Sequence, residues 1–244
     1  MRSQKFTMTF FILGEICLSL SHSAHALLLS PMSASLSPTG DGATRSFELT
    51  NQFDKSIAVQ LSVAERIQES NGKETIKKSS EISKSFVLFP ASFTLKPREK
   101  RVVRLAWRGD SQLDRELNYR LIAEQLPISG EREKTSNDRS AMVNLLMKYI
   151  AAVYITPSDA RPQIEIIQTR RDKSLMKLRI KNIGKKHQIL RKFSLQWDGG
   201  SISHEQLREL SGQNILAGQE RDFEFTWPKS MATTAKNYRL VIHP

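Results

Sequence analysis

Hydrophobic and polar residues alternate along most of the chain after residue 26. In the longest run Ile57, Val59, Leu61 and Val63 are separated by smaller or polar residues. A period of two places successive side chains on opposite faces of a strand, so each such run predicts a β-strand with one buried face. Further runs are Phe47 and Leu49; Tyr119 and Leu121; Leu178 and Ile180; Phe193, Leu195 and Trp197; Phe223, Phe225 and Trp227; and Tyr238, Leu240 and Ile242.

Short strands separated by turn signals predict an all-β chain, and their number is sufficient for two sandwich domains. The stretch TPSDARP, residues 156–162, interrupts the apolar pattern with two prolines and small polar residues. We place the boundary there, with domains at residues 27–157 and 158–244. The polar stretch from Glu65 to Ser85 predicts an exposed hairpin or loop without an assigned function.

The first 26 residues have the features of a secretory signal peptide. Two basic residues precede an apolar run over residues 6–20, and Ala24-His25-Ala26 has the small-x-small form that signal peptidase cleaves after. We predict a mature chain of 218 residues that begins at Leu27. A membrane anchor is the alternative, but the run is shorter than the ~20 apolar residues of a spanning helix, so no stable membrane insertion is expected.

The predicted mature chain has no cysteine and is strongly basic. The single cysteine, Cys17, lies in the leader, which excludes a thiol nucleophile and thiolate metal ligands. Buried apolar surface must therefore hold the domains together without disulfides. The leader accounts for one unit of the formal net charge of +12, which leaves +11 and suits an acidic partner or an anionic surface.

The stretch from Phe86 to Pro127 combines strand patterns with characteristic turn residues. It reads FVLFPASFTLKPREKRVVRLAWRGDSQLDRELNYRLIAEQLP. Pro90 interrupts an apolar run, Leu95-Lys96-Pro97 marks a turn, and Asp114-Arg115-Glu116 precedes Tyr119-Arg120-Leu121. This combination resembles the first domain of periplasmic pilus chaperones of the chaperone-usher, or PapD-like, class, and the Tyr-Arg-Leu run looks like the archaic or alternative branch.

The resemblance continues through nearly all of the mature chain. The turn at 182–187, NIGKKH, resembles the family's Asn-x-Gly-x-x-His motif, and 215–218, ILAG, resembles its Leu-Pro-Gly turn with Ala217 in the proline's place. The resemblance implies two immunoglobulin-like β-sandwich domains arranged at an angle with a cleft between them. It also implies a periplasmic, cofactor-free protein that stabilises pilus subunits (pilins) and delivers them to an outer-membrane usher.

The segment 141–155, AMVNLLMKYIAAVYI, is largely apolar on both faces. Its C-terminal part fits a central sandwich strand, whereas its N-terminal part follows a hydrophilic connection that offers no apolar cover. In the chaperones that it resembles, this strand lends alternate apolar side chains to a subunit that lacks its own final strand. The expected donor residues are Val143, Leu145 and Met147, and Leu146 or Ile150 is expected in the core.

In the family, a basic pair deep in the cleft grips the C-terminal carboxylate of the subunit. The matching positions here are Ser33 and Ala152, which cannot form that ion pair. Arg120 and Lys148 on adjoining strands are the candidate carboxylate anchor, because an arginine fork bonds both carboxylate oxygens and lysine adds a compact charge. The alternative is that both residues only solvate a surface and that subunit capture has been lost or altered.

Glu116 matches a carboxylate of the family's interdomain ion-pair network. The arginine partner in that network would fall at Thr156, so the usual network cannot form. Glu116 is the candidate interdomain contact, and without the usual network we expect the angle between the domains to be set differently.

Other classes of function have little support in the sequence. His187, His204 and His243 show no metal-binding spacing, and neither a Gly-x-Ser-x-Gly elbow nor a phosphate-binding glycine loop is present, which predicts a protein that is not an enzyme and has no metal site. Basic runs fall at predicted turns of an exported chain, so no nucleic-acid partner is expected. The alternatives are a secreted immunoglobulin-like binding module and a pilin-like structural subunit without chaperone activity.

Overall fold

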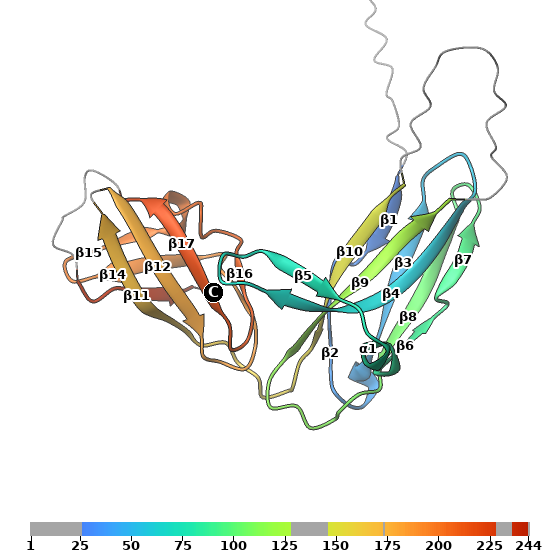
Figure 1. Ribbon diagram of the computed structural model, residues 1–244, viewed down its shortest axis with the longest axis horizontal. Helices are drawn as coiled ribbons and strands as arrows, with labels where there is room; N and C mark the ends of the chain where they lie inside the picture. The colour runs from blue at the N-terminus through green and yellow to red at the C-terminus, as the bar shows by residue number, and fades with distance from the viewer. Residues whose placement is uncertain (1–25, 128–145, 173, 228–235, 244) are drawn as a thin grey trace, which may run out of the picture.

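The structure is a computed structural model that describes residues 26–127, 146–172, 174–227 and 236–243. Strands make up most of these residues, and they form two domains at an angle to each other (Figure 1). The strands between 27 and 155 pair only among themselves, as do those between 164 and 242. The prediction of an all-β chain with two sandwich domains is confirmed.

Two sheets face each other in the first domain. One has the order β1-β3-β8-β6, and the other has the order β2-β10-β9-β4-β5, with β7 paired to β4. The two sheets consist of β1 (Leu27–Ser30), β3 (Thr44–Asn51), β8 (Lys100–Trp107) and β6 (Phe86–Phe89), and of β2 (Ser33–Leu36), β10 (Lys148–Ile155), β9 (Leu117–Leu126), β4 (Ile57–Gln68), β5 (Glu74–Lys77) and β7 (Ser92–Leu95).

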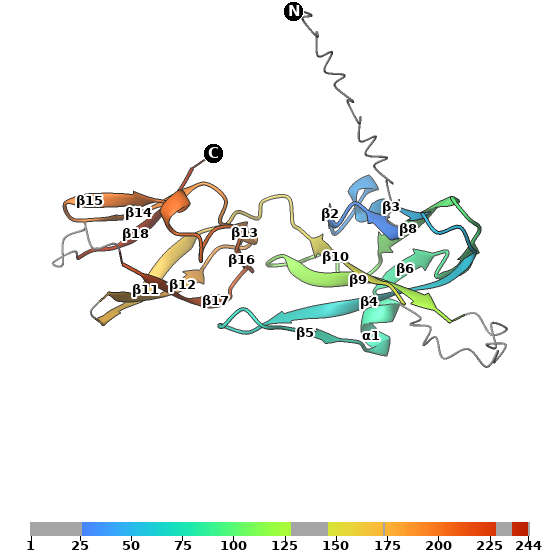
Figure 2. The same ribbon diagram turned by 90° about the horizontal axis from the view of Figure 1, so that it is seen from above.

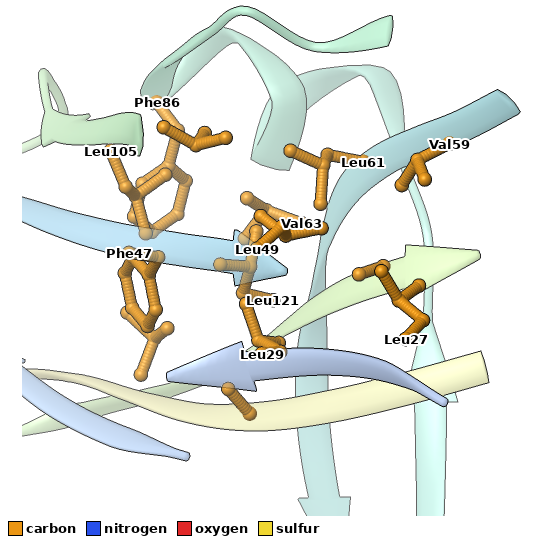
Figure 3. Close-up of a cluster of buried hydrophobic side chains, with 14 of the residues drawn as sticks. Leu27, Leu29, Phe47, Leu49, Val59, Leu61, Val63, Phe86, Leu105 and Leu121 are labelled. Carbon is orange, nitrogen blue, oxygen red and sulfur yellow. The ribbon is translucent and has the colours of Figure 1, made fainter. Parts of the chain in front are cut away.

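The core of the first domain lies between these sheets, and alternate residues of each strand fill it. Figure 3 shows Phe47 and Leu49 of β3 in the same cluster as Leu61 and Val63 of β4. All four are buried. The predicted alternation of β4 is thus the alternation between core and outer face. At about 25 cal/mol per Å² of buried apolar surface, such a cluster is the main source of stability in a domain without disulfides.

The second domain packs two three-stranded sheets and a short ribbon around a second core. Phe193, Phe223 and Trp227 are buried in that core. The strands are β11 (Ile164–Asp172), β12 (Leu175–Asn182) and β17 (Glu220–Thr226); β15 (Gly200–Ser203), β14 (Phe193–Trp197) and β18 (Arg239–Ile242); and the ribbon of β13 (Gln188–Ile189) with β16 (Asn214–Ile215). Three short helices complete the described chain: η1 (Asp41–Ala43), α1 (Ser80–Lys84) and η2 (His204–Gln206).

The polar stretch expected to be an exposed hairpin or loop is a hairpin with a partly buried end. Strand β4 continues to Gln68 and pairs with β5. Figures 1 and 2 show the hairpin reaching from the first domain to β16 and β17 of the second. The Asp222 N–H donates to Ser70 O at 2.8 Å, and Arg66 and Gln68 are buried. The charged hairpin is therefore not fully exposed to solvent, because the second domain covers part of it.

The faces of β10 differ from the expectation for Leu146. Ala151, Val153 and Ile155 lie in the core, and Met147 packs partly buried against it. Because faces alternate, the even-numbered residues lie on the outer face, where the Leu146 side chain is 49% exposed. The expectation of Leu146 in the core was therefore wrong, and Ile150 is half-buried on that outer face.

Candidate functional site

Glu116 joins the two domains through hydrogen bonds. Its side chain, in the loop before β9, has no solvent exposure. One carboxylate oxygen accepts from the Thr156 hydroxyl at 2.8 Å. The other accepts from the His187 backbone N–H at 3.1 Å and lies 2.7 Å from His187 Nδ1. Thr156 thus partners Glu116 where the family has an arginine, and His187 supplies the contact from the second domain.

The Asn-x-Gly-x-x-His turn holds His187 in place. Asn182 is fully buried, and its Oδ1 accepts from the backbone N–H groups of Gln163 and Gly184 at 3.2 and 3.1 Å. Its Nδ2 donates to Ile215 O at 3.1 Å. A Cβ on Gly184 would lie 2.4 Å from the Gln163 nitrogen, so only glycine fits. The motif is therefore a turn that carries a histidine to the domain interface.

An apolar contact lies beside this hydrogen-bonded one. Leu216, in the turn that resembles Leu-Pro-Gly, forms a buried cluster with Ala152 and Tyr154 of β10. The Tyr154 ring stacks on the His187 imidazole with centroids 3.9 Å apart and planes at 12°. The outer face of β10 is therefore the surface on which the second domain rests.

Three arginines meet where β4, β9 and β17 come together, and we call Arg66, Arg120 and Arg221 the arginine cluster. Glu74, the first residue of β5, accepts from Arg66 Nη2 through one carboxylate oxygen and from Arg120 Nη2 through the other. Arg221 donates to the neutral acceptors Gln213 Oε1 and Asn214 O at 3.1 and 3.0 Å. Salt bridges from two of the three arginines thus end on one carboxylate.

Positive charge is in excess in the arginine cluster. The side chains of Arg66 and Arg120 are 5% and 15% exposed, and Arg221 is also buried. The Nε atoms of all three are buried, and no residue in the described part of the chain accepts a hydrogen bond from them. Buried cationic donors without acceptors are costly.

The electrostatics of the cluster agree with this excess. Burial, followed by the positive charge of Arg66, lowers the pKa of Arg221 below its ordinary value. Burial would raise the pKa of the Glu74 carboxyl, but the hydrogen bonds and charges of Arg120 and Arg66 outweigh burial and hold that pKa below its ordinary value. Anions are therefore favoured at this place.

Arg120 lies in the same cross-strand row as the family's anchor positions. It is directly opposite Ala152 on β10. Ala152 is in turn directly beside Ser33 on β2. Directly opposed residues share a face of the sheet, with Cβ atoms about 5 Å apart. Arg120 is therefore a basic residue in the same row as Ser33 and Ala152, one strand further along.

The row ends near a cavity of about 300 Å³ between the domains. Arg66, Asn118 and Tyr119 line it from the first domain, and Leu216 and Gln219 line it from the second. The cavity borders the arginine cluster at Arg66.

The first half of β10 has an open edge. Strand β2 pairs with β10 only from Ala152 to Ile155, and β9 pairs along its whole length on the other side. The Ala152 N–H donates to Met32 O on the β2 side at 2.9 Å. Residues two and four positions earlier, Ile150 and Lys148, direct their backbone groups to the same edge, where no described strand pairs with them. An open edge is a template for another strand.

The predicted site residues fall into three places. Arg120 lies in the arginine cluster, whereas Lys148 is exposed opposite Glu124 at the start of β10. Lys148 lies four positions before Ala152, about 13 Å along a strand, and Arg120 is opposite Ala152, so the structure does not bring the two basic residues together. Val143 and Leu145 lie outside the described residues, and Met147 packs partly buried against the core.

Sequence reasoning missed Arg66, Glu74, Arg221 and the contact of His187. Arg66 continues the outer face of β4, two residues beyond Ala64, and this continuation was a usable signal. Glu74 and Arg221 gave no local signal, because only tertiary contacts bring their elements to β4 and β9.

The structure holds no indication of a metal centre or a membrane span in its described part. No group of three or more histidine, cysteine, aspartate or glutamate side chains is gathered there in an arrangement that could hold a metal ion. None of the helices within the described ranges is long and apolar enough to cross a bilayer.

Solved structures with similar folds include pilus chaperones and complexes that contain them. The class 5 fimbriae chaperone CfaA matches with a TM-score of 0.58 at 12% identity, over 90% of this chain and 100% of its own. A chain of the Acinetobacter baumannii CsuC–CsuE chaperone–tip adhesion subunit complex, from archaic Csu pili, matches with a TM-score of 0.54 at 16% identity, over 81% and 89% of the two chains. A chain of the Salmonella enterica SafA pilin–SafB chaperone complex matches with a TM-score of 0.53 at 12% identity, over 91% and 98%.

At these identities the structural matches establish the fold, which is the two-domain all-β fold of pilus chaperones. No curated protein matches the chain in sequence. The family described as "Pili and flagellar-assembly chaperone, PapD N-terminal domain" matches residues 32–160, more than half of the chain. The match includes β2, β9 and β10, which carry the row of Ser33, Ala152 and Arg120. By this match over its first domain, and with the fold of its whole described length, the chain belongs to the family of pilus chaperones.

Proposed function

We propose that this protein captures pilus subunits in the periplasm by donor-strand complementation and delivers them to an outer-membrane usher. The signal peptide predicted at residues 1–26 would bring it to that compartment. The observation that carries the proposal is the open edge of β10. This edge ends at Ala152, directly opposite Arg120 of the arginine cluster on β9. An edge that accepts a strand and a basic site that accepts a chain end fit one extended ligand with a free carboxylate.

The open edge supports capture by strand addition. A subunit strand would pair with the backbone groups of Lys148 and Ile150, so that β10 becomes a strand of the subunit's sheet. Residues two apart on one face would then enter successive pockets of the subunit. Val143 and Leu145 have the same parity in sequence as Met147, and we propose these three as the donor residues.

The arginine cluster supports an anchor for the subunit's terminal carboxylate. We propose Arg120 as the anchoring residue, with Arg66 and Arg221 beside it and Lys148 as an exposed contact further along the strand. Charge-assisted bonds from a guanidinium to a carboxylate are directional, so the anchor would fix the register of the subunit on β10. A fixed register decides which apolar side chain enters which pocket.

The proposed activity needs no cofactor and no covalent step. Strand pairing and apolar burial supply the binding energy. Release to the usher would follow when another donor strand fits the subunit better.

Co-expression with candidate pilins that are exported beside this protein tests the proposal. The chaperone is purified, and co-elution of a subunit is measured for the wild type, for Arg120→Ala and for Leu145→Glu. We expect the subunit to co-elute with the wild type and to be lost with both variants, since one removes the anchor and the other places a charge in an apolar pocket. Lys148→Ala should weaken retention less.

Two matched controls separate these effects from general damage. Arg45→Ala removes an exposed arginine on β3 that bonds only a neighbouring carbonyl among its described contacts. Ile167→Glu adds a carboxylate at an exposed apolar position on β11. Both should retain the subunit. Retention by Arg120→Ala and Leu145→Glu would refute these sites, and absence of any co-eluting subunit would favour an immunoglobulin-like binding module without chaperone activity.

A further inference from the structure

We propose that Glu74 is a built-in competitor for the arginine cluster, a carboxylate of the chaperone itself that an incoming terminal carboxylate must displace. The inference deepens the proposed function and rests on it for the identity of the ligand. It assigns a regulatory part to a residue of the β4–β5 hairpin, outside the strands that meet the subunit.

The geometry of Glu74 is that of a bound carboxylate ligand. One oxygen accepts from Arg66 and the other from Arg120, so the side chain bridges two guanidinium groups from different strands. A free chain terminus presents the same two oxygens on one carbon. Glu74 therefore holds the donors that a subunit terminus needs, and both carboxylates cannot occupy them together.

The placement of Glu74 allows it to leave. It is the first residue of β5, a four-residue edge strand that pairs only with β4 in the described sheet. Its side chain is 28% exposed, compared with 5% for Arg66. It is paired with Gln68 at the last pair of the hairpin, next to the turn. Rotation of the side chain toward solvent would free the arginines without separating the strands.

The same contact explains how the free chaperone tolerates a buried cluster of three arginines. A buried charge without a partner is strongly destabilising, and Glu74 provides compensation within the chain. A ligand binds the arginine cluster only if it has a carboxylate that replaces the carboxylate of Glu74. A chain terminus that is amidated, or an apolar segment without a terminus, would leave the Glu74 contacts in place. Glu74 would thus favour ligands with a free carboxylate.

Titration of the 15N-labelled mature chain with sodium acetate tests the inference without any subunit. The Nε–Hε signals of Arg66 and Arg120 report occupation of the cluster. The signal that is lost in Arg120→Lys is assigned to Arg120. We expect acetate to shift these signals at a concentration about tenfold lower in Glu74→Gln than in the wild type, because a tethered competitor acts at a high effective concentration. Glu74→Asp keeps the charge but shortens its reach, and should lie between them.

Glu69→Gln is the matched control. It removes the same charge from the same hairpin, and the described contact of its carboxylate is with Asn71 at the turn. Its titration should follow the wild type. If Glu74→Gln is too unstable to study, Glu74→Asp carries the comparison.

Equal midpoints for the wild type, Glu74→Gln and Glu74→Asp would overturn the inference, since acetate would then bind beside Glu74 rather than in its place. No response in any variant would overturn it as well, because the freed cluster should bind a carboxylate. Co-elution of a pilin with the wild type decides the proposed function separately. If a subunit co-elutes but the acetate midpoints are equal, the role of Glu74 as a competitor is refuted and subunit capture is not. If Glu74→Gln has a lower acetate midpoint than the wild type but no subunit co-elutes, subunit capture is refuted and the role of Glu74 is not.

Discussion

At the scale of single residues, buried polar side chains do the same task in both domains. Asn51 donates to Leu95 O at 3.2 Å and to Lys96 O at 2.8 Å, and Asn182 makes the corresponding contacts around its own turn. Glu116 extends this use of buried polar groups across the domain boundary. A buried polar group must find its partners, so each of these residues fixes the loops around it.

We expect Glu116→Ala to lower the free energy of unfolding by about 3 kcal/mol. The substitution leaves the His187 N–H and the Thr156 hydroxyl in a buried place without their acceptor. Urea unfolding followed by tryptophan fluorescence measures the change. Asp114→Ala removes an exposed carboxylate two residues away and its salt bridge to Lys185 of the second domain, and should lower the midpoint much less. A loss of stability for Asp114→Ala as large as for Glu116→Ala would contradict a specific role for the buried contact.

Glu74 should make stability depend on pH in the acid range. Its folded pKa lies below the ordinary value of 4.5, because the Arg120 and Arg66 contacts outweigh burial. A carboxyl with a depressed folded pKa stabilises the protein fully above its unfolded pKa, and this contribution is lost as the pH falls through the folded pKa. Urea midpoints measured between about pH 6 and about pH 3 should therefore fall less for Glu74→Gln than for the wild type. Parallel curves for the two proteins would contradict the shift.

At the scale of elements, β10 serves two purposes along its length. Its second half is a central strand between β2 and β9, and its first half is an edge. Edge strands usually carry devices that prevent pairing with other chains. Lys148, exposed on this half, is one such device, since a charge on an edge discourages nonspecific addition. The division of one strand into a paired half and an open half is what a donor strand requires.

Hydrogen exchange should reveal this division. We expect the amides of Lys148 and Ile150 to exchange faster than the amide of Ala152, whose N–H donates to Met32 O. Addition of a captured subunit should slow Lys148 and Ile150 and change Ala152 little, because only the first two would gain acceptors. Exchange resolved to single residues by NMR measures all three. Equal protection of the three amides in the free protein would show that the edge is already covered.

At the scale of the whole molecule, the β4–β5 hairpin extends from the first domain and contacts the second. It touches β17 through Ser70 and approaches Arg221 at Gly72. The second link is the contact of Glu116 with His187 at the other side of the interface. Together with the packing of Leu216 against Ala152 and Tyr154, these contacts oppose rotation of one domain against the other, so we expect them to set the angle seen in Figure 1.

Gly72→Ala tests whether the β4–β5 hairpin affects the angle between the domains, and Gly199→Ala is its matched control. Both glycines have positive φ, +89° and +92°, so alanine costs each turn about 1 kcal/mol of backbone strain. A Cβ on Gly72 would lie 2.3 Å from Nη2 of Arg221, a buried side chain held by hydrogen bonds to Gln213 and Asn214, whereas a Cβ on Gly199 would meet nothing within 4 Å. Small-angle scattering should show a changed radius of gyration for Gly72→Ala alone. The same scattering curve for both variants would contradict this expectation and show that the Arg221 side chain moves aside for the methyl group.

Much of the fold was predictable because its signals are local. Alternation in β4, β9, β12 and β17 predicted strands with one buried face, and the asparagine–glycine turn at residues 182–187 was visible as a motif. Such patterns act between neighbouring residues, so they are present in the sequence before the chain folds. The interface position of Glu116 was also expected from its motif, although His187 as its partner was not.

The candidate site depended on tertiary structure to a much greater extent. Arg66, Glu74, Arg120 and Arg221 come together only because β4, β5, β9 and β17 do, and nothing in the local pattern records that meeting. Which face of β10 enters the core also depended on tertiary structure. Both faces are apolar, so the sequence pattern does not distinguish the odd-numbered residues from the even-numbered ones. Local patterns in the sequence were sufficient to predict the strands and the turns, and the sequence shows directly that positions 33 and 152 are not basic. The meeting of Arg66, Arg120 and Arg221 depended on the fold, because electrostatic partners are selected by distance in space and by burial.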